Sequence, residues 1–212
     1  YPIVLIGSQK ILIKQIKYFN YKHKVKIINS TEINELKNNN FINLININLD
    51  KPNNISKNYH INDYIEKTFN VAFKLLKDKK ASGLINGPIS KKKFLKKNFL
   101  GVTEYICDYF AIKKNAMLIY NKDLSVCPIT THLPIKLVSK NISKKKIKKK
   151  IILINDFYNK ILGYKPKIAI LGLNPHCESI HKYNEDEKIL KPLIKNLGKQ
   201  FSVYGPLSAD TV

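Results

Sequence analysis

The chain has 212 residues, enough for one large or two small domains, and no apolar stretch approaches the roughly 20 residues that a membrane-spanning helix needs. Its formal net charge is +23, but all 38 basic residues are lysines spread along the chain, with an excess of isoleucine and asparagine that an AT-rich coding sequence produces. Because specific nucleic-acid sites favour arginine, we do not expect a nucleic-acid-binding protein. Because the chain has no long apolar stretch, we do not expect a membrane protein either.

The first half of the chain alternates apolar segments with amphipathic ones. The polar residues 51–58 predict a loop, and Gly87-Pro88 predicts a turn. Residues 43–49 alternate Asn with Ile or Leu, which is the period of a half-buried strand. Strands are predicted at residues 2–7, 25–28, 43–49 and 81–86, and helices at residues 9–19 and 63–79. The apolar residues of these helices are Ile11, Ile13, Ile16 and Phe19 in the first, and Ile65, Phe69, Ala72, Phe73 and Leu76 in the second.

The second half continues the alternation. Residues 141–162 form an amphipathic pattern that ends at Gly163, so the lysine run 144–150 is interpreted as a solvated helix face. Residues 184–187, three of which are acidic, open a further helix that Gly198 ends. Strands are predicted at 116–120, 124–130 and 167–171, and a shorter helix at 103–111. The whole alternation predicts an α/β fold with a largely parallel sheet.

Three cysteines, Cys107, Cys127 and Cys177, give an odd number without paired spacing. This pattern is typical of the reducing cytoplasm, where no disulfide framework forms, so we expect a cytoplasmic protein. Cys177 adjoins His176, and the sequence leaves open whether its thiol fills space as a small side chain or acts as a soft metal ligand.

Two histidines follow predicted strands. Gly172-Leu-Asn-Pro-His176 comes directly after the apolar segment 167–171, and Thr131-His132-Leu-Pro134 follows the segment 124–130. Ligands of open α/β sheets bind beyond the carboxyl ends of strands, and imidazole binds a metal or a proton. Two imidazoles are too few for a good metal site, and a satisfied loop histidine is the alternative interpretation. The other histidines, His23, His60 and His181, are interpreted as surface groups.

Several common motifs are absent from the chain, including Gly-x-Gly-x-x-Gly, the P-loop and Gly-x-Ser-x-Gly. Five segments instead resemble, in order, motifs of the 4-hydroxythreonine-4-phosphate dehydrogenases of vitamin B6 synthesis. They are Leu84-Ile-Asn-Gly-Pro-Ile-Ser-Lys91, Gly101-Val-Thr-Glu104, Thr131-His-Leu-Pro134, Gly172-Leu-Asn-Pro-His176 with Glu178 and Glu185-Asp186-Glu187 nearby, and Gly205-Pro-Leu-Ser-Ala-Asp-Thr211.

The resemblance implies an isocitrate/isopropylmalate-dehydrogenase-like fold, with two α/β/α lobes, a cleft between them and a homodimer. We expect the first lobe at residues 1–90 and the second at 91–212. The implied chemistry is NAD-dependent oxidation of 4-phosphohydroxy-L-threonine, followed by decarboxylation to 3-amino-2-oxopropyl phosphate. A divalent metal (zinc, magnesium or cobalt) would stabilise the developing alkoxide and the later enolate.

By resemblance, His132 and His176 are metal ligands, and Val102 and Thr103 lie at the substrate. Val102 replaces a substrate-contacting histidine of the family, and valine cannot donate a hydrogen bond. The family's third metal histidine, given across the dimer, lies in a His-Asp-Gln segment beyond residue 212, and its Gly-Asp-Pro opening precedes Tyr1. We therefore expect a fragment cut at both ends and inactive alone. A phosphorylated sugar acid as substrate and a non-catalytic relative remain alternatives.

Overall fold

The structure is a computed structural model that describes residues 2–37, 40–49, 58–95, 99, 101–179, 181 and 183–210; the side chains of 58–60, 91 and 92 lie outside this description. The chain divides into two compact units, Tyr1–Val102 and Thr103–Val212, each of which is described by itself. The predicted lobe boundary near residue 90 stays a prediction. Within the described part, no helix has the length and apolar character needed to cross a membrane.

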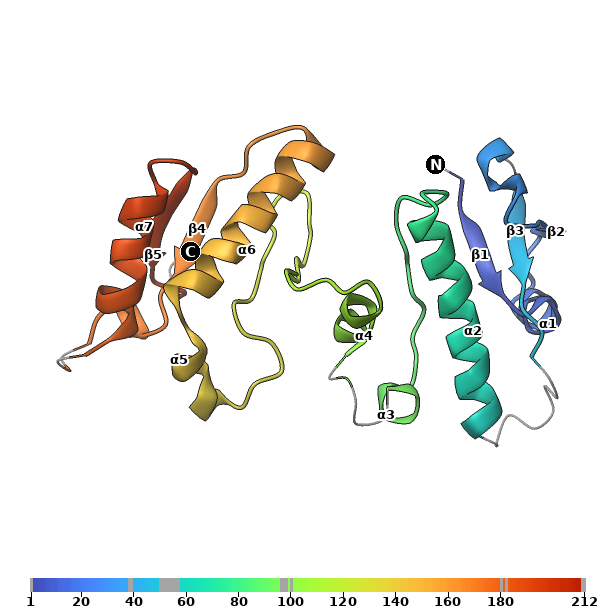
Figure 1. Ribbon diagram of the computed structural model, residues 1–212, viewed down its shortest axis with the longest axis horizontal. Helices are drawn as coiled ribbons and strands as arrows, with labels where there is room; N and C mark the ends of the chain where they lie inside the picture. The colour runs from blue at the N-terminus through green and yellow to red at the C-terminus, as the bar shows by residue number, and fades with distance from the viewer. Residues whose placement is uncertain are drawn as a thin grey trace. The chain divides into compact units, whose positions relative to one another are not determined.

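The first unit contains a parallel sheet of three strands in the order β1-β3-β2. They are β1 (Val4–Gly7), β2 (Lys24–Ile27) and β3 (Phe41–Asn46). Figure 1 shows these strands beside one another, which confirms the predicted parallel arrangement. The interpretation of the third segment as half-buried is wrong at its centre, because the successive residues Asn43 and Leu44 are both buried. Successive strand residues point to opposite faces, so both faces of this middle strand are covered there.

Helices α1 (Gln9–Tyr18), α2 (Asn58–Lys77) and α3 (Lys91–Phe94) accompany this sheet. Helix α2 carries the core of the unit, since Phe69, Ala72 and Phe73 are buried as predicted. The ring of Phe69 also stacks on that of Phe94, with centroids 5.7 Å apart. Helix α1 buries none of its residues, and Phe19, expected on its apolar side, is 56% exposed. The predicted loop at 51–58 lies outside the described residues except for Asn58, which begins α2.

Residues 81–86 do not form the predicted strand. They run as irregular chain between α2 and α3, and Ile85 is 91% exposed. An apolar segment becomes a strand only where a neighbouring strand accepts its backbone hydrogen bonds and an opposing layer covers its side chains. The described residues of the first unit provide neither at this place.

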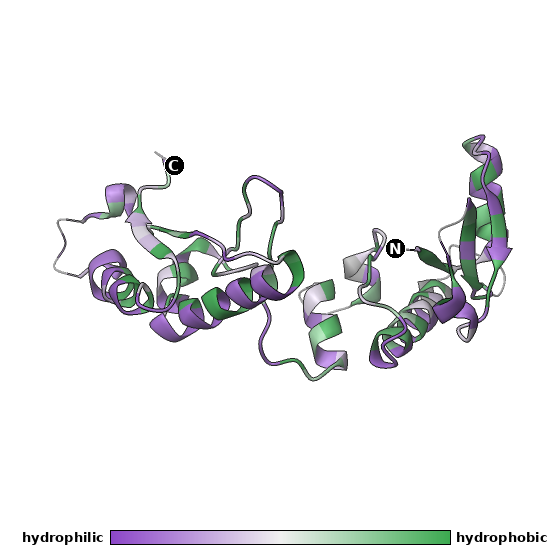
Figure 2. Ribbon diagram, turned by 90° about the horizontal axis from the view of Figure 1, so that it is seen from above, coloured by the Kyte–Doolittle hydropathy of each residue, from purple (hydrophilic) through white to green (hydrophobic). Residues whose placement is uncertain are grey.

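The second unit is built on two parallel strands, β4 (Ile168–Leu171) and β5 (Val203–Leu207). Figure 2 shows α6 (Lys144–Phe157) and α7 (Lys191–Leu197) on one side of these strands. Apolar side chains from all four elements meet there and exclude water, and this burial holds the unit together. The buried members are Ile147, Ile151, Ile170, Leu190, Leu193, Ile194, Leu197 and Val203.

The lysine-rich helix forms much as the sequence predicts. Helix α5 (Val138–Asn141) precedes it, and the Ser143 hydroxyl accepts a hydrogen bond from the backbone N–H of Lys146, capping α6. A π-helical turn extends α6 to Leu162, and Gly163 ends it in the left-handed conformation, with φ +79°. Most lysines of the run are exposed, which confirms the interpretation of a solvated face.

Residues 116–120 and 124–130 do not form the two predicted strands. A single antiparallel bridge joins Ile119 to Val126, and both side chains are mostly exposed. Pro128 lacks the N–H that a continuing ladder requires, and in the described part of the unit no second strand pairs with this segment. His132 therefore does not follow a strand, although His176 does.

The thiol of Cys127, in this irregular segment, offers a test of local burial. Burial raises its pKa, and the positive charge of Lys150 opposes that rise only in part. We expect alkylation of Cys127 by iodoacetamide near pH 8 to be slower in the folded protein than in urea, as measured by mass spectrometry of its peptide. Because the folded-state pKa is the higher one, this thiol's contribution to stability is present below the unfolded pKa and is lost as pH rises through the folded pKa. Equal folded and unfolded alkylation rates would contradict the assignment.

Candidate functional site

The candidate site lies where β4 and β5 end. The two strands are parallel, so their carboxyl ends meet at one edge, and the backbone N–H of Gly172 donates to the carbonyl of Leu207 at 2.9 Å. The segments that follow, residues 172–177 and 208–210, are therefore neighbours. They bring the His176 Nδ1 atom to 4.0 Å from the Asp210 carboxylate. This edge is the usual position of ligands in α/β folds.

Two glycines allow this close approach. Gly205, in β5, has φ +121°, and a Cβ at this position would lie 2.4 Å from the carbonyl oxygen of Ile170 on β4. At Gly172, a Cβ would lie 2.5 Å from the Sγ atom of Cys177. Both positions thus require glycine, the first for its backbone angle and contact, the second for its contact.

A buried carboxylate holds the loop that carries His176. Asp186 is 0% exposed and accepts hydrogen bonds from the backbone N–H groups of Leu173 (2.8 Å) and Asn174 (3.1 Å). The side-chain amide of Asn174 donates a third bond to the same carboxylate at 2.8 Å. Asp186 begins a π-helical turn, Asp186–Leu190, and buried Asn184 accepts from the backbone N–H of Glu187. The carboxylate therefore comes from an ordered element 12 residues beyond Asn174.

His176, next to this anchored segment, has an unusual backbone. Its φ is +55°, and φ of the following Cys177 is +59°. His132 shares the left-handed conformation, with φ +56°. Non-glycine residues in this region cost roughly 1–2 kcal/mol each, so the surrounding contacts must over-determine them. At His176 these contacts are identified: Cys177 is buried against Gly172, and Asp186 fixes Leu173 and Asn174.

The electrostatics of the edge centre on Asp210. A hydrogen bond from the Ser208 hydroxyl is the largest cause that holds the pKa of the Asp210 carboxyl below its usual range, and the nearby His176 imidazole acts in the same direction. The His176 side chain is 76% exposed and that of Asp210 is 62% exposed, so solvent screens their attraction. The contribution of this pair to stability is therefore small.

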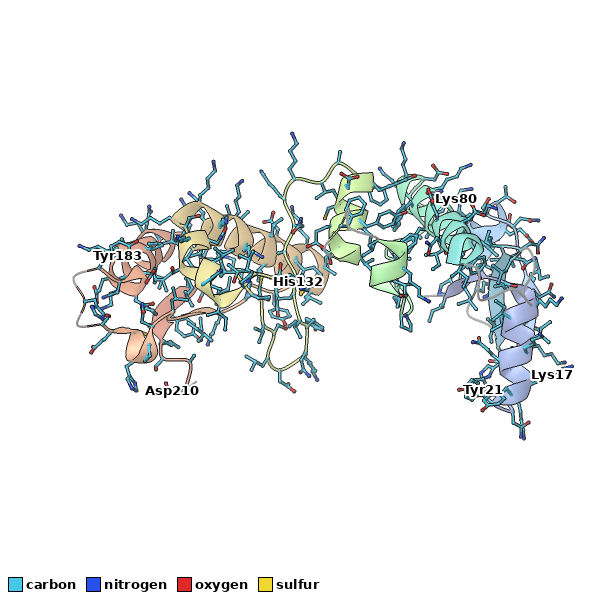
Figure 3. The ribbon with its side chains drawn as sticks, turned by 90° about the horizontal axis from the view of Figure 1, so that it is seen from below. Lys17, Tyr21, Lys80, His132, Tyr183 and Asp210 are labelled. Atoms are coloured by element: carbon cyan, nitrogen blue, oxygen red, sulfur yellow. The ribbon has the colours of Figure 1, made fainter. Side chains whose placement is uncertain are left out.

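The other predicted site residues lie elsewhere. Figure 3 shows the exposed His132 well apart from Asp210 within the second unit, and since His176 lies beside Asp210, the structure does not bring the two histidines together. Val102 and Thr103 are half-buried residues in the first turn of α4 (Val102–Tyr109), at the boundary between the two units. In the part of the chain that the structure describes, no group of three or more His, Cys, Asp or Glu could hold a metal ion.

The sequence did not reveal the role of Asp186. The acidic group at 184–187 predicts only the start of a helix, whereas the structure directs one of its carboxylates into the interior and its neighbour Glu187 to the surface, where it pairs with Lys191. No local signal distinguishes these two carboxylates. The only available clue was the nearness of an acidic cluster to Gly172-Leu-Asn-Pro-His176 in the sequence.

A family model matches residues 1–212, the whole chain, and its description is pyridoxal phosphate biosynthetic protein PdxA. Curated relatives carry the name 4-hydroxythreonine-4-phosphate dehydrogenase. One from Sulfurihydrogenibium sp. is 41% identical over 145 residues, which are 66% of this chain and 45% of the relative. One from Wigglesworthia glossinidia brevipalpis is 35% identical over 141 residues, or 64% of this chain and 42% of the relative. The matched part of the chain thus covers less than half the length of these relatives.

Solved structures described by the same enzyme name share the fold. One from Salmonella typhimurium superimposes with a TM-score of 0.83 at 25% identity, covering 100% of this chain and 67% of the solved one. A second, from Klebsiella pneumoniae, also has a TM-score of 0.83, at 24% identity and with the same coverage. The arrangement of strands and helices described above is therefore an established one.

Proposed function

Because the chain belongs to the family of the pyridoxal phosphate biosynthetic protein PdxA, we propose that the whole protein is a 4-hydroxythreonine-4-phosphate dehydrogenase. It would oxidise 4-phosphohydroxy-L-threonine with NAD, and the product would lose carbon dioxide to give 3-amino-2-oxopropyl phosphate. The observation that carries the proposal is the β4–β5 edge, where a strained, anchored loop presents His176 beside Asp210. Strained backbone of this kind clusters at active sites.

We further propose two α/β/α lobes with the substrate in a cleft between them, in a cytoplasmic homodimer. Free thiols at all three cysteines agree with a reducing compartment. A shared site would give the dimer a functional reason, because the described residues of one chain offer imidazoles but no complete set of metal ligands.

Imidazole side chains are suitable ligands for a divalent metal, but the described residues offer too few of them at one place for a complete site. His176 exposes an imidazole, His132 exposes another that lies apart from it, and a catalytic zinc takes three protein ligands. The proposed metal at His176, zinc, magnesium or cobalt, would therefore need further ligands from another part of the protein or from a second copy. When bound, such a cation supplies positive charge to a developing alkoxide.

The chain's own residues have two proposed tasks at this site. The Asp210 carboxylate lies 4.0 Å from Nδ1 of His176, so Nε2 is the imidazole atom proposed to bind the metal. Thr103, in the first turn of α4, can direct its hydroxyl toward a substrate phosphate. Both tasks concern binding and orientation and agree with an oxidation in which NAD accepts the hydride.

Val102 stands where the family has a histidine that contacts the substrate, so we expect it to change substrate binding or turnover. Replacing Val102 with histidine tests this directly. In the whole protein we expect Val102→His to raise kcat/KM for 4-phosphohydroxy-L-threonine by roughly 10- to 150-fold, because a hydrogen bond to a charged group contributes about 1.5–3 kcal/mol. Thr103→Ala should lower kcat/KM. Steady-state kinetics of both variants provide the measurement. If neither change alters the kinetics, these residues do not lie at the substrate and a non-catalytic relative becomes the better interpretation.

The proposed activity is tested by the appearance of NADH absorbance in the whole protein with 4-phosphohydroxy-L-threonine. EDTA should abolish the signal, and zinc, magnesium or cobalt ions should restore it. A phosphorylated sugar acid in the same assay tests the second candidate substrate. Activity with neither substrate, in protein reloaded with each cation, would refute the proposed dehydrogenase.

A further inference from the structure

The structure assigns a positioning role to Asp186: its buried carboxylate holds the loop 173–177 in the strained conformation that presents His176. This inference rests on the proposed function for the importance of His176 and adds a residue that makes no contact with the substrate. It goes beyond the stability of the unit because the bonds of Asp186 all reach one loop, the loop that carries the proposed ligand.

Burying the Asp186 carboxylate costs free energy. Asp186 is 0% exposed, and among the described residues no ion pair compensates its charge. A buried carboxylate is costly unless hydrogen-bond donors surround it. The three N–H donors of Leu173 and Asn174 are its identified partners. A structural core does not need such a group, whereas a loop that must keep one backbone conformation does.

The hydrogen bonds of Asp186 determine the backbone conformation of the loop before His176. One carboxylate oxygen accepts from Leu173, and the other accepts both the backbone and the side-chain N–H of Asn174. They fix the two residues that precede Pro175, whose ring restricts the next φ angle. The chain then enters the left-handed conformation at His176 and Cys177. Without this anchor, relaxation of the strained angles would turn the imidazole away from Asp210.

The chemistry of the carboxylate makes Asp186→Asn a sharp variant. An asparagine keeps the shape and accepts at one atom only, so its own NH2 group would face the N–H donors on one side. We expect amide hydrogen exchange at Leu173 and Asn174 to become roughly 10- to 100-fold faster, as measured by NMR in the whole protein. Zinc affinity by calorimetry and kcat/KM should fall by at least about tenfold, as expected when an outer partner of a metal ligand is lost.

Glu187→Gln is the matched control. It removes a neighbouring carboxylate that pairs with Lys191 at the surface and makes none of the bonds to the loop. Loop exchange, zinc affinity and kcat/KM should stay at wild-type values in this variant. If Asp186→Asn fails to fold, Asn174→Ala serves in its place. It keeps the backbone bonds to Asp186 and removes the side-chain bonds of Asn174 to Asp186 (2.8 Å) and Glu185 (3.3 Å), so it should move all three readouts less far in the same direction.

The outcomes separate this inference from the proposed function. Wild-type exchange at Leu173 and Asn174 in Asp186→Asn overturns the positioning role. Faster exchange with unchanged zinc affinity and kcat/KM also overturns it, provided that His176→Ala abolishes zinc binding. If His176→Ala binds zinc as the wild type does, the proposed metal role of His176 fails, and faster loop exchange in Asp186→Asn still supports the anchor.

Discussion

Replacing Gly205 with alanine should destabilise the second unit by about 2–6 kcal/mol, a large part of the roughly 5–15 kcal/mol that holds a typical domain. Two causes act together. A φ of +121° is strained for any residue with a Cβ, and that Cβ would stand 2.4 Å from the Ile170 carbonyl oxygen. Because a backbone atom cannot move aside as a side chain does, β5 must shift away from β4 and disturb the candidate site at their ends.

Hydrogen–deuterium exchange of peptides covering β4 and β5, combined with urea unfolding, measures this effect. Gly163→Ala is the matched control, because φ at Gly163 is also positive, at +79°, but nothing lies within 4 Å of the added Cβ. It should cost only about 1 kcal/mol, the backbone strain alone. Equal destabilisation by the two variants would show that the contact with Ile170 contributes nothing.

Replacing His176 with alanine should reduce kcat/KM of the whole protein by roughly 10²- to 10⁴-fold, which corresponds to about 3–5 kcal/mol of transition-state stabilisation. The reason is the loss of an imidazole that the proposed chemistry uses directly. His132→Ala should act in the same direction if both histidines serve one metal. Stability should change little, because the His176 side chain is 76% exposed.

Steady-state kinetics with zinc present in excess provide the measurement, and His181→Ala is the control. His181 is also exposed and lies five residues further along the chain, outside the anchored loop. It should retain wild-type kcat/KM. A His176→Ala variant as active as the wild type would exclude His176 from the reaction and leave the family membership untouched.

Local sequence patterns predicted the elements whose physical requirements are local. The apolar segment before Gly172 forms β4, and the lysine-rich pattern forms α6, which continues in a π-helical turn and ends at Gly163. Amphipathic spacing identifies α2 and its buried Phe69 and Phe73. In each case the pattern itself states which side faces the core, because helical and strand periods are properties of the backbone.

The predicted strands that do not form are apolar segments without a neighbouring strand to pair with. Residues 81–86, 116–120 and 124–130 have the composition of strands, yet they form irregular chain with one bridge between Ile119 and Val126. A strand depends on hydrogen bonds to a distant segment, and composition carries no information about whether that segment is present. The expectation that His132 follows a strand failed for this reason.

The family, the parallel α/β class and the position of His176 at a strand end follow from the amino-acid sequence alone. That His176 and Asp210 are neighbours, and that Asp186 is a buried anchor of the His176 loop, becomes visible once the chain is folded. The physical reason is the parallel pairing of β4 and β5, which joins residues more than 30 positions apart. Whether a carboxylate is a surface charge or a buried acceptor depends on what folds over it, as the adjacent Asp186 and Glu187 show.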